Sequence, residues 1–353
     1  MRVYQAGQNP LRDNRSPFPP PLPIPPVELD SYLQNARDQQ RQRGANSRIG
    51  RHWQILINGL NAPRNRGTAA HPRYLDIAAL EDCYNLNDKS VIALLISKAS
   101  SWGLNQIAAV YLQPLMYSRK SAKRANARGE LEDYSPLTSV TLTAFAVPME
   151  TLSDKKYPVR SFFSAVHAIL YYCLPHNQSL REYTEILTHL RNLLARALRP
   201  YLSEQMGLFR VKISLLVCLS PANSRDSRAI IGFSAVGKKQ LKSIIIQDRM
   251  EHLRALQDVR SNGTWPVGNC AEDETFAHIP ELCSSPIGQS RDVIAAFLTV
   301  DILEGNSNGP CQQCRDLINI LLRQLRTATI LSLAVKRNRR EVEGSEYSSI
   351  TIN

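Results

Sequence analysis

Two cysteine motifs far apart in the chain constrain its fold more than any other feature. Cys311 and Cys314 form a Cys-x-x-Cys pair directly after Pro310, and Cys270 stands upstream of them. The pair opens a segment with a helical stripe of leucine and isoleucine, so both thiols are expected at a helix start. Zn²⁺ prefers such soft ligands, and a helix N-terminus helps to keep them ionised. The sequence therefore predicts a zinc site made of Cys270, Cys311 and Cys314.

The number of protein ligands indicates what kind of zinc site this is. Three protein ligands leave the fourth tetrahedral position for water, which is typical of catalytic rather than structural sites. Glu272 follows Cys270 by two residues. If both residues belong to the first turn of a helix, the Glu272 carboxylate lies beside the metal without binding it. We therefore predict that Glu272 acts as a general acid and base, a role that contributes roughly a hundred- to ten-thousandfold in rate.

These motifs resemble those of a known superfamily. The Cys270-Ala271-Glu272 motif followed by Pro310, Cys311 and Cys314 is similar to the signature of the cytidine deaminase-like superfamily of zinc-dependent nucleobase deaminases. The preceding Gly-Asn pair is similar to the toxin-type and fungal branches. The resemblance covers about residues 180–335 and is specific only at the two motifs. It implies three zinc-ligating cysteines, Glu272 as the proton carrier, and a central sheet flanked by helices with both motifs at helix N-termini.

Two other readings of the cysteines stay open. Cys283 could supply a fourth thiolate, which would make the site structural. Alternatively, the domain has a deaminase-like fold without catalysis and serves as a zinc-containing module that binds nucleic acid or protein. His278 is expected on a helix surface and not at the metal, because it lies six residues beyond Glu272.

The pattern of residues along the chain predicts an α/β fold in its C-terminal half. Strand-like segments over 211–219 and 229–236 flank turn residues and predict a hairpin. Helices are expected over 159–172, 180–202, 240–259 and 314–325, and further strands over 293–300 and 327–335. Residues 139–147 are expected to form either a strand or an irregular edge. Strands and helices thus alternate around the two motifs, as in a layered α/β domain with a mixed sheet flanked by helices.

The same pass along the chain divides it into four parts. Residues 1–73 are expected to form a disordered tail that is rich first in proline and then in arginine. Residues 74–175 are expected to be a mainly helical region without an assigned role, and they include a basic loop over 118–128. Residues 176–340 would be the deaminase-like zinc domain, and residues 341–353 a polar tail.

Charge and composition bear on partners and location. The net charge of +12 favours anionic partners, so a nucleic acid or a nucleotide is the expected substrate. Cytosine is the favoured base only because the superfamily acts on it most often. No apolar run is long enough for a membrane span, and the N-terminus lacks the apolar stretch of a secretory signal. An odd number of cysteines, seven, does not suggest a disulfide framework. We therefore expect an intracellular protein, cytoplasmic or nuclear.

Overall fold

The structure is a computed structural model. It describes residues 73–117, 122–125, 131–134, 136–137, 139–152, 154–201, 211–219, 227–237, 239–252, 266–283, 293–307, 309–324 and 328–333, together with Asp38 and Arg41. The two predicted tails, 1–73 and 341–353, lie almost wholly outside these residues. The boundary near residue 176 stays a prediction.

A four-stranded mixed sheet forms the centre of the described chain, in the order β6-β5-β7-β8. Its strands are β5 (Lys212–Leu219), β6 (Ser227–Phe233), β7 (Val293–Asp301) and β8 (Ala328–Ser332). β5 pairs antiparallel with both β6 and β7, whereas β7 and β8 run parallel. The predicted hairpin and the two later strands are confirmed. Nearly every described residue of β5, β6 and β7 is buried, because helices cover the sheet on both sides.

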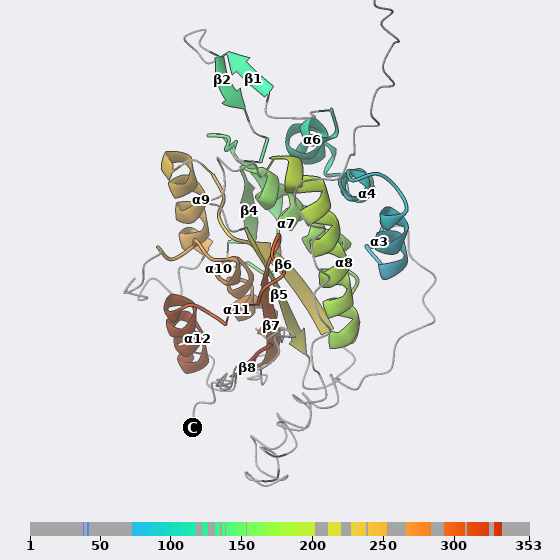
Figure 1. Cartoon of the computed structure of the whole chain (residues 1–353). Helices are drawn as coiled ribbons and strands as arrows, with labels where there is room; N and C mark the ends of the chain where they lie inside the picture. The colour runs from blue at the N-terminus through green and yellow to red at the C-terminus, as the bar shows by residue number, and fades with distance from the viewer. Residues whose placement is uncertain are drawn as a thin grey trace, which may run out of the picture.

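Helices flank the sheet in two groups (Figure 1). α7 (Phe162–Cys173) and α8 (Leu180–Leu198) lie on one side and contact β6 and β5. On the other side lie α9 (Lys239–His252), α10 (Ala271–Phe276), α11 (Ile279–Cys283) and α12 (Gln312–Gln324). The four predicted helices are confirmed as α7, α8, α9 and α12, and the described chain is a mixed helix and sheet fold.

Helix α8 shows how the sequence sets these boundaries. It begins at a capping box in which the Ser179 hydroxyl accepts from the Glu182 N–H and the Glu182 carboxylate accepts from the Ser179 N–H. Its apolar stripe is buried, and it ends at Leu198, before a short 3₁₀ turn that contains Pro200. Proline cannot continue the α-helical hydrogen bonding, so the helix ends before the predicted end at residue 202.

The region before α7 contains helices and two small hairpins. The helices are α3 (Ile77–Tyr84), α4 (Ser90–Ser101), α5 (Asn105–Ile107) and α6 (Gln113–Tyr117), with a π-helical turn over Ala108–Leu112. The hairpins pair β1 (Ala122–Ala125) with β2 (Leu131–Tyr134), and β3 (Phe145–Pro148) with β4 (Lys156–Val159). The loop predicted over 118–128 is therefore wrong for residues 122–125. Pairing with β2 places these residues in a strand although lysine has a low strand propensity.

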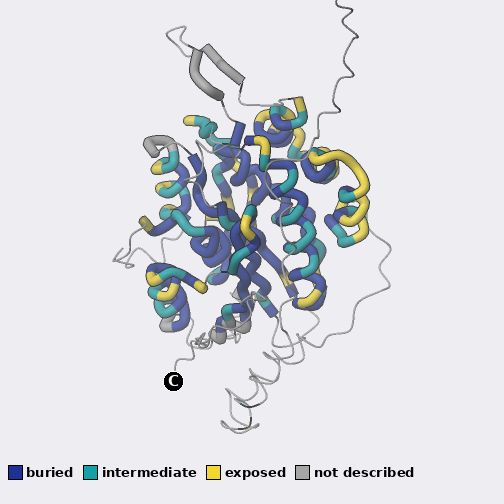
Figure 2. Tube along the Cα trace, viewed as in Figure 1, coloured by how far each residue is buried: buried dark blue, intermediate teal, exposed yellow. Residues whose placement is uncertain are grey.

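A single buried core extends through the described chain, from Leu75 to Leu333 (Figure 2). α3 and α4 pack against α8, so the helices of the first region share this core with the sheet. Within the described ranges, no helix has both the length and the apolar character needed to cross a membrane.

Candidate metal centre

The three predicted ligands lie together. The Sγ atoms of Cys270 and Cys311 are 3.7 Å apart, those of Cys311 and Cys314 are 3.4 Å apart, and all three lie within 4.8 Å of one another. Tetrahedral zinc with Zn–S bonds of about 2.3 Å separates its sulfur ligands by roughly 3.8 Å. The cluster therefore has the spacing that one zinc ion needs, although three close cysteines are compatible with other thiophilic metals too.

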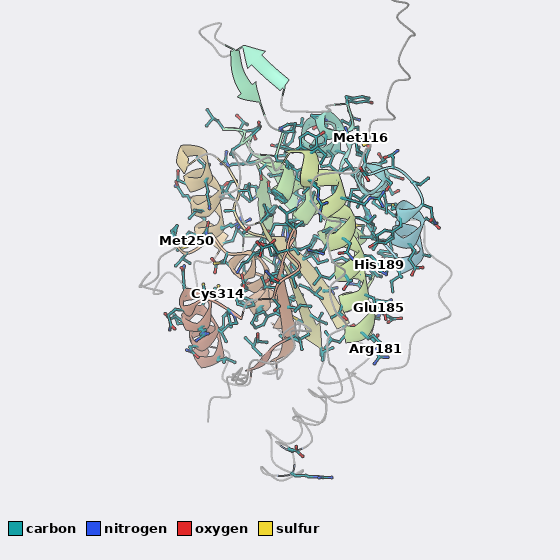
Figure 3. All side chains as sticks on the ribbon, viewed as in Figure 1. Met116, Arg181, Glu185, His189, Met250 and Cys314 are labelled. Carbon is teal, nitrogen blue, oxygen red and sulfur yellow. The ribbon has the colours of Figure 1, made fainter. Side chains whose placement is uncertain are left out.

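Each cysteine occupies a helix start, as predicted. Cys270 is the N-cap of α10, Cys311 directly precedes α12, and Cys314 lies in the first turn of α12. Cys314 is fully buried on the side of α12 that faces the sheet (Figure 3), whereas the other two are half-buried. Side-chain hydrogen bonding with Cys270 and Cys314 lowers the pKa of Cys311, so one thiolate is favoured within the cluster. The cluster is thus buried at Cys314 and partly accessible at Cys270 and Cys311.

No fourth acidic, cysteine or histidine ligand joins this group among the described residues. The Asp273 carboxylate is the nearest candidate, with Oδ1 3.9 Å from the Sγ of Cys314. Cys283, the alternative fourth ligand, is the last residue of α11, and its side chain lies outside the described part of the structure. The described donors fit a three-cysteine site.

The loop that carries Cys270 is held by two buried charged residues. The Asp273 carboxylate accepts hydrogen bonds from the N–H groups of Gly268, at 2.8 Å, and Cys270, at 3.1 Å. The Arg249 guanidinium donates to the Gly268 carbonyl at 3.1 Å. Gly268 has a φ of +89°, and a Cβ there would lie 2.8 Å from the Ile246 carbonyl oxygen. Only glycine combines this backbone conformation with such close packing against α9.

Glu272 lies inside the molecule, next to the cysteine cluster. Its side chain is buried in the first turn of α10. Burial raises the pKa of its carboxyl, the Lys212 charge and a hydrogen bond with Thr299 act in the opposite direction, and the nearby Cys311 raises it further. The Thr299 hydroxyl in turn lies 3.0 Å from that of Ser214. Glu272 therefore sits between the cysteines and two hydroxyl groups of the sheet, without being one of the grouped metal ligands.

Helix α10 can reach this position because Gly232 on β6 has no side chain. A Cβ at Gly232 would lie 2.9 Å from Cγ2 of Thr275, 3.0 Å from the carbonyl oxygen of Ala271 and 3.1 Å from Cβ of Glu274. The Ala271 contact is with the helix backbone, so a side chain at Gly232 would push the whole helix away from the sheet. The seating of Cys270 and Glu272 depends on this close approach.

We expect Gly232→Ala to destabilise the protein by roughly 1–3 kcal/mol, the usual cost of overpacking. It should also weaken zinc binding, because α10 must shift. Urea unfolding and metal titration measure the two effects. Gly309→Ala is the matched control, because a Cβ at Gly309 meets no atom within 4 Å. Equal stability of the two variants would contradict this account of the α10 packing.

The structure also shows a buried polar network behind α10 that the sequence did not reveal. The Tyr157 hydroxyl donates to the Glu274 carboxylate, which also accepts from Arg249 at 2.8 Å and from the Phe233 N–H at 2.6 Å. The His167 ring lies 3.8 Å from the same carboxylate. Although burial acts in the opposite direction, Arg249 and His167 lower the pKa of Glu274, which stays ionised. Glu274 thereby joins α10 to α7, α9, β4 and β6.

His278 belongs to this buried region, so its predicted place on a helix surface is wrong. Its exposed fraction is 0%, its Nδ1 lies 2.7 Å from the Thr151 hydroxyl, and its Nε2 has no hydrogen-bond partner in the described structure. The short α10 ends before His278, and the chain then turns inward. The sequence interpretation failed because it extended one regular helix past residue 276.

This burial predicts a pH dependence of stability. Burial, followed by the charges of His167 and His252, lowers the pKa of His278 well below its ordinary value of 6.5. Below pH 6.5 His278 therefore binds a proton in the unfolded chain but not in the folded chain. The free energy of unfolding consequently falls as the pH drops through this range. We expect a loss of roughly 1–3 kcal/mol between pH 7.5 and about 5.5, with a smaller loss in His278→Gln.

Urea unfolding midpoints at several pH values check this prediction. Metal release at low pH affects wild type and variant alike, so the difference between them reports His278. His189→Gln, which changes a half-buried histidine on α8, is the control. A His278→Gln profile as steep as that of the wild type would contradict the expected role.

Comparisons with protein-family models, with curated proteins and with solved structures gave no match to this chain.

Proposed function

We propose that this protein is a zinc-dependent hydrolase that deaminates a nucleobase. The observation that carries the proposal is the burial of Glu272 beside three cysteine thiols that are spaced for one zinc ion. The arrangement of the sheet also supports the deaminase-like fold implied by the motifs. Helices flank a central sheet, and both cysteine motifs stand at helix N-termini.

The reaction replaces the amino group on a ring carbon by oxygen from water and releases ammonia. A bound zinc ion would lower the pKa of a water molecule so that hydroxide is available near neutral pH. Glu272 is placed to accept the proton that this water loses. It would give this proton to the ring nitrogen. It would then take the proton of the new hydroxyl group on the ring carbon and pass it to the leaving amine, so that ammonia departs as the carbonyl forms. Hydrogen bonding with Thr299 lowers the pKa of the Glu272 carboxyl, and the Thr299 hydroxyl is itself fixed by donating to Ser214 at 3.0 Å.

Cytosine, in a nucleic acid or a nucleotide, is the substrate proposed first. The motifs suggest this base through their resemblance to the superfamily, and the basic composition favours a phosphate-bearing form.

Metal analysis followed by a substrate screen tests the proposal. The purified protein should contain about one zinc per chain. Nucleosides, nucleotides, DNA and RNA are then incubated with it and examined by mass spectrometry for conversion of an amino group to a carbonyl. X-ray absorption decides the coordination: three sulfur ligands and one oxygen support the catalytic site, whereas four sulfur ligands favour the non-catalytic module. In the latter case Cys283→Ser should release the metal, and in the former it should not.

A further inference from the structure

Lys212 is a cation at the edge of the site, and the reaction proposed above gives it no role. It is the first residue of β5 and is half-buried. Its backbone is fixed on both sides, because its N–H donates to the Ser234 hydroxyl at 3.0 Å and its carbonyl accepts from the Ser234 N–H at 2.9 Å. The base of the side chain is therefore held in place, while the ammonium group extends from a defined point at the end of the strand.

The register of the sheet places Lys212 on the face that carries the site. Side chains two residues apart in a strand point to the same face, so Lys212 and Ser214 share one. Ser214 is the direct partner of Gly232 on β6 and of Thr299 on β7. α10 packs on Gly232, and Glu272 is hydrogen-bonded to Thr299. Lys212 thus lies one step beyond this row, about 7 Å further along the strand, and its charge interacts with Glu272.

The ammonium group has no close acidic partner in the described part of the chain. No carboxylate there forms an ion pair with Lys212 within 4.0 Å. Asp301 is opposite Lys212 on β7, but its carboxylate bonds to the backbone of the following turn. Its Oδ1 accepts hydrogen bonds from the N–H groups of Leu303 and Glu304, each at 2.9 Å. A lysine without a partner is ordinary on a protein surface. Lys212, however, is half-buried, lies on the same face of the sheet as the Glu272 carboxylate, and is two positions along β5 from Ser214.

We propose that Lys212 receives a phosphate of the substrate, and that the protein therefore acts on phosphorylated nucleobase compounds in preference to free nucleosides. This inference rests on the proposed deaminase function and refines its substrate class. In this proposal the base lies beside Glu272, and the phosphate meets the ammonium group of a residue about 7 Å further along β5. The phosphate could belong to a nucleotide or to a strand that contains the target base, and the chemistry of recognition is the same.

The test compares matched substrates with and without phosphate. For the zinc-loaded full chain, kcat/KM is measured with cytidine, cytidine monophosphate and a short single-stranded oligonucleotide, and with the adenosine and guanosine sets. We expect the wild type to prefer a phosphorylated form at least tenfold. Lys212→Met should lower kcat/KM for that form at least tenfold more than for the nucleoside, whereas Lys212→Arg should keep most of the preference. Preference for the oligonucleotide alone would identify a strand phosphate as the source.

Arg228→Met is the matched control for the loss of one positive charge. Arg228 is exposed on β6 and pairs with Cys218, so it lies at the opposite end of the same sheet from Lys212. Its loss should leave the ratio between phosphorylated and free substrates unchanged. If Lys212→Met lowers kcat/KM equally for both forms, Lys212 acts on Glu272 and the inference is wrong. A wild type without preference for phosphate also overturns it.

A binding measurement separates this inference from the proposed function. Zinc-loaded Glu272→Gln protein is titrated with cytidine and with cytidine monophosphate, in the presence and absence of the Lys212→Met change. Tighter binding of the monophosphate that depends on Lys212 supports the inference even if no turnover is found. Absence of turnover with every substrate, in wild-type protein that contains zinc, counts against deamination. Equal binding of the two ligands counts against the phosphate contact.

Discussion

Glu272→Gln is expected to keep its zinc and its fold but to lose deamination by at least the roughly hundredfold factor typical of a general acid and base. Glutamine preserves the shape and hydrogen-bonding capacity of the side chain, but its amide cannot take up the proton from water. Since Glu272 is not among the grouped ligands, zinc content should stay at the wild-type level. Activity and metal content are measured on the same preparations, with a substrate that the wild type converts.

Glu281→Gln is the control for this substitution. Glu281 is half-buried on α11, outside the cysteine cluster. The substitution makes the same change there, from a carboxylate to an amide. It should retain wild-type activity within about a factor of two, as expected for a substitution away from the reacting groups. Deamination by Glu272→Gln at the wild-type rate would show that the proton carrier is another group.

Cys311→Ser is expected to abolish zinc binding and to destabilise the fold. Cys311 is the sulfur nearest to both of the others, at 3.7 Å and 3.4 Å, so its loss leaves two ligands that start different helices. Metal binding to a folded site contributes directly to folding free energy. We expect zinc content to fall from about one ion per chain to near zero, with a decrease in Tm of at least several degrees.

The control for this prediction is Cys218→Ser, which alters a half-buried cysteine on β5 outside the cluster. It should keep the metal. Emission spectrometry gives zinc content, and thermal unfolding with and without a chelator gives its contribution to stability. A Cys311→Ser protein that still contains one zinc per chain would refute the ligand assignment.

The sequence allowed the cysteine cluster and most regular elements to be predicted, because these depend on local patterns. The stripe of α8, its capping residues and the apolar strands β5 and β7 each carry their own signal within a few residues. The cysteine motifs carried a chemical signal strong enough to place two distant segments together. The position of Glu272 beside the cluster was predicted from its place two residues after Cys270.

The buried network around Glu274 could not be predicted, because its members share no local pattern. Arginine and glutamate are seldom buried unless they are paired, and the pairing of Arg249 with Glu274 at 2.8 Å depends on how α9 and α10 meet. His278 was misplaced because α10 has only six residues. The phosphate-binding role proposed for Lys212 rests on the register between strands, which no single segment specifies. Long-range packing therefore decides the parts of the site that the sequence left open.

The parallel pairing of β7 and β8 would make a metal bound at the cysteine cluster relevant to aggregation. β8 is the edge strand of the described sheet, and α12, which contacts β8, is joined to the rest of the site through Cys311 and Cys314. If that link is lost, α12 and β8 can separate from the sheet and expose the apolar strand β7. A long, flat, apolar edge is a template for pairing with another chain. A metal bound at this site should thus limit association of the protein through β7, and chelation should favour it.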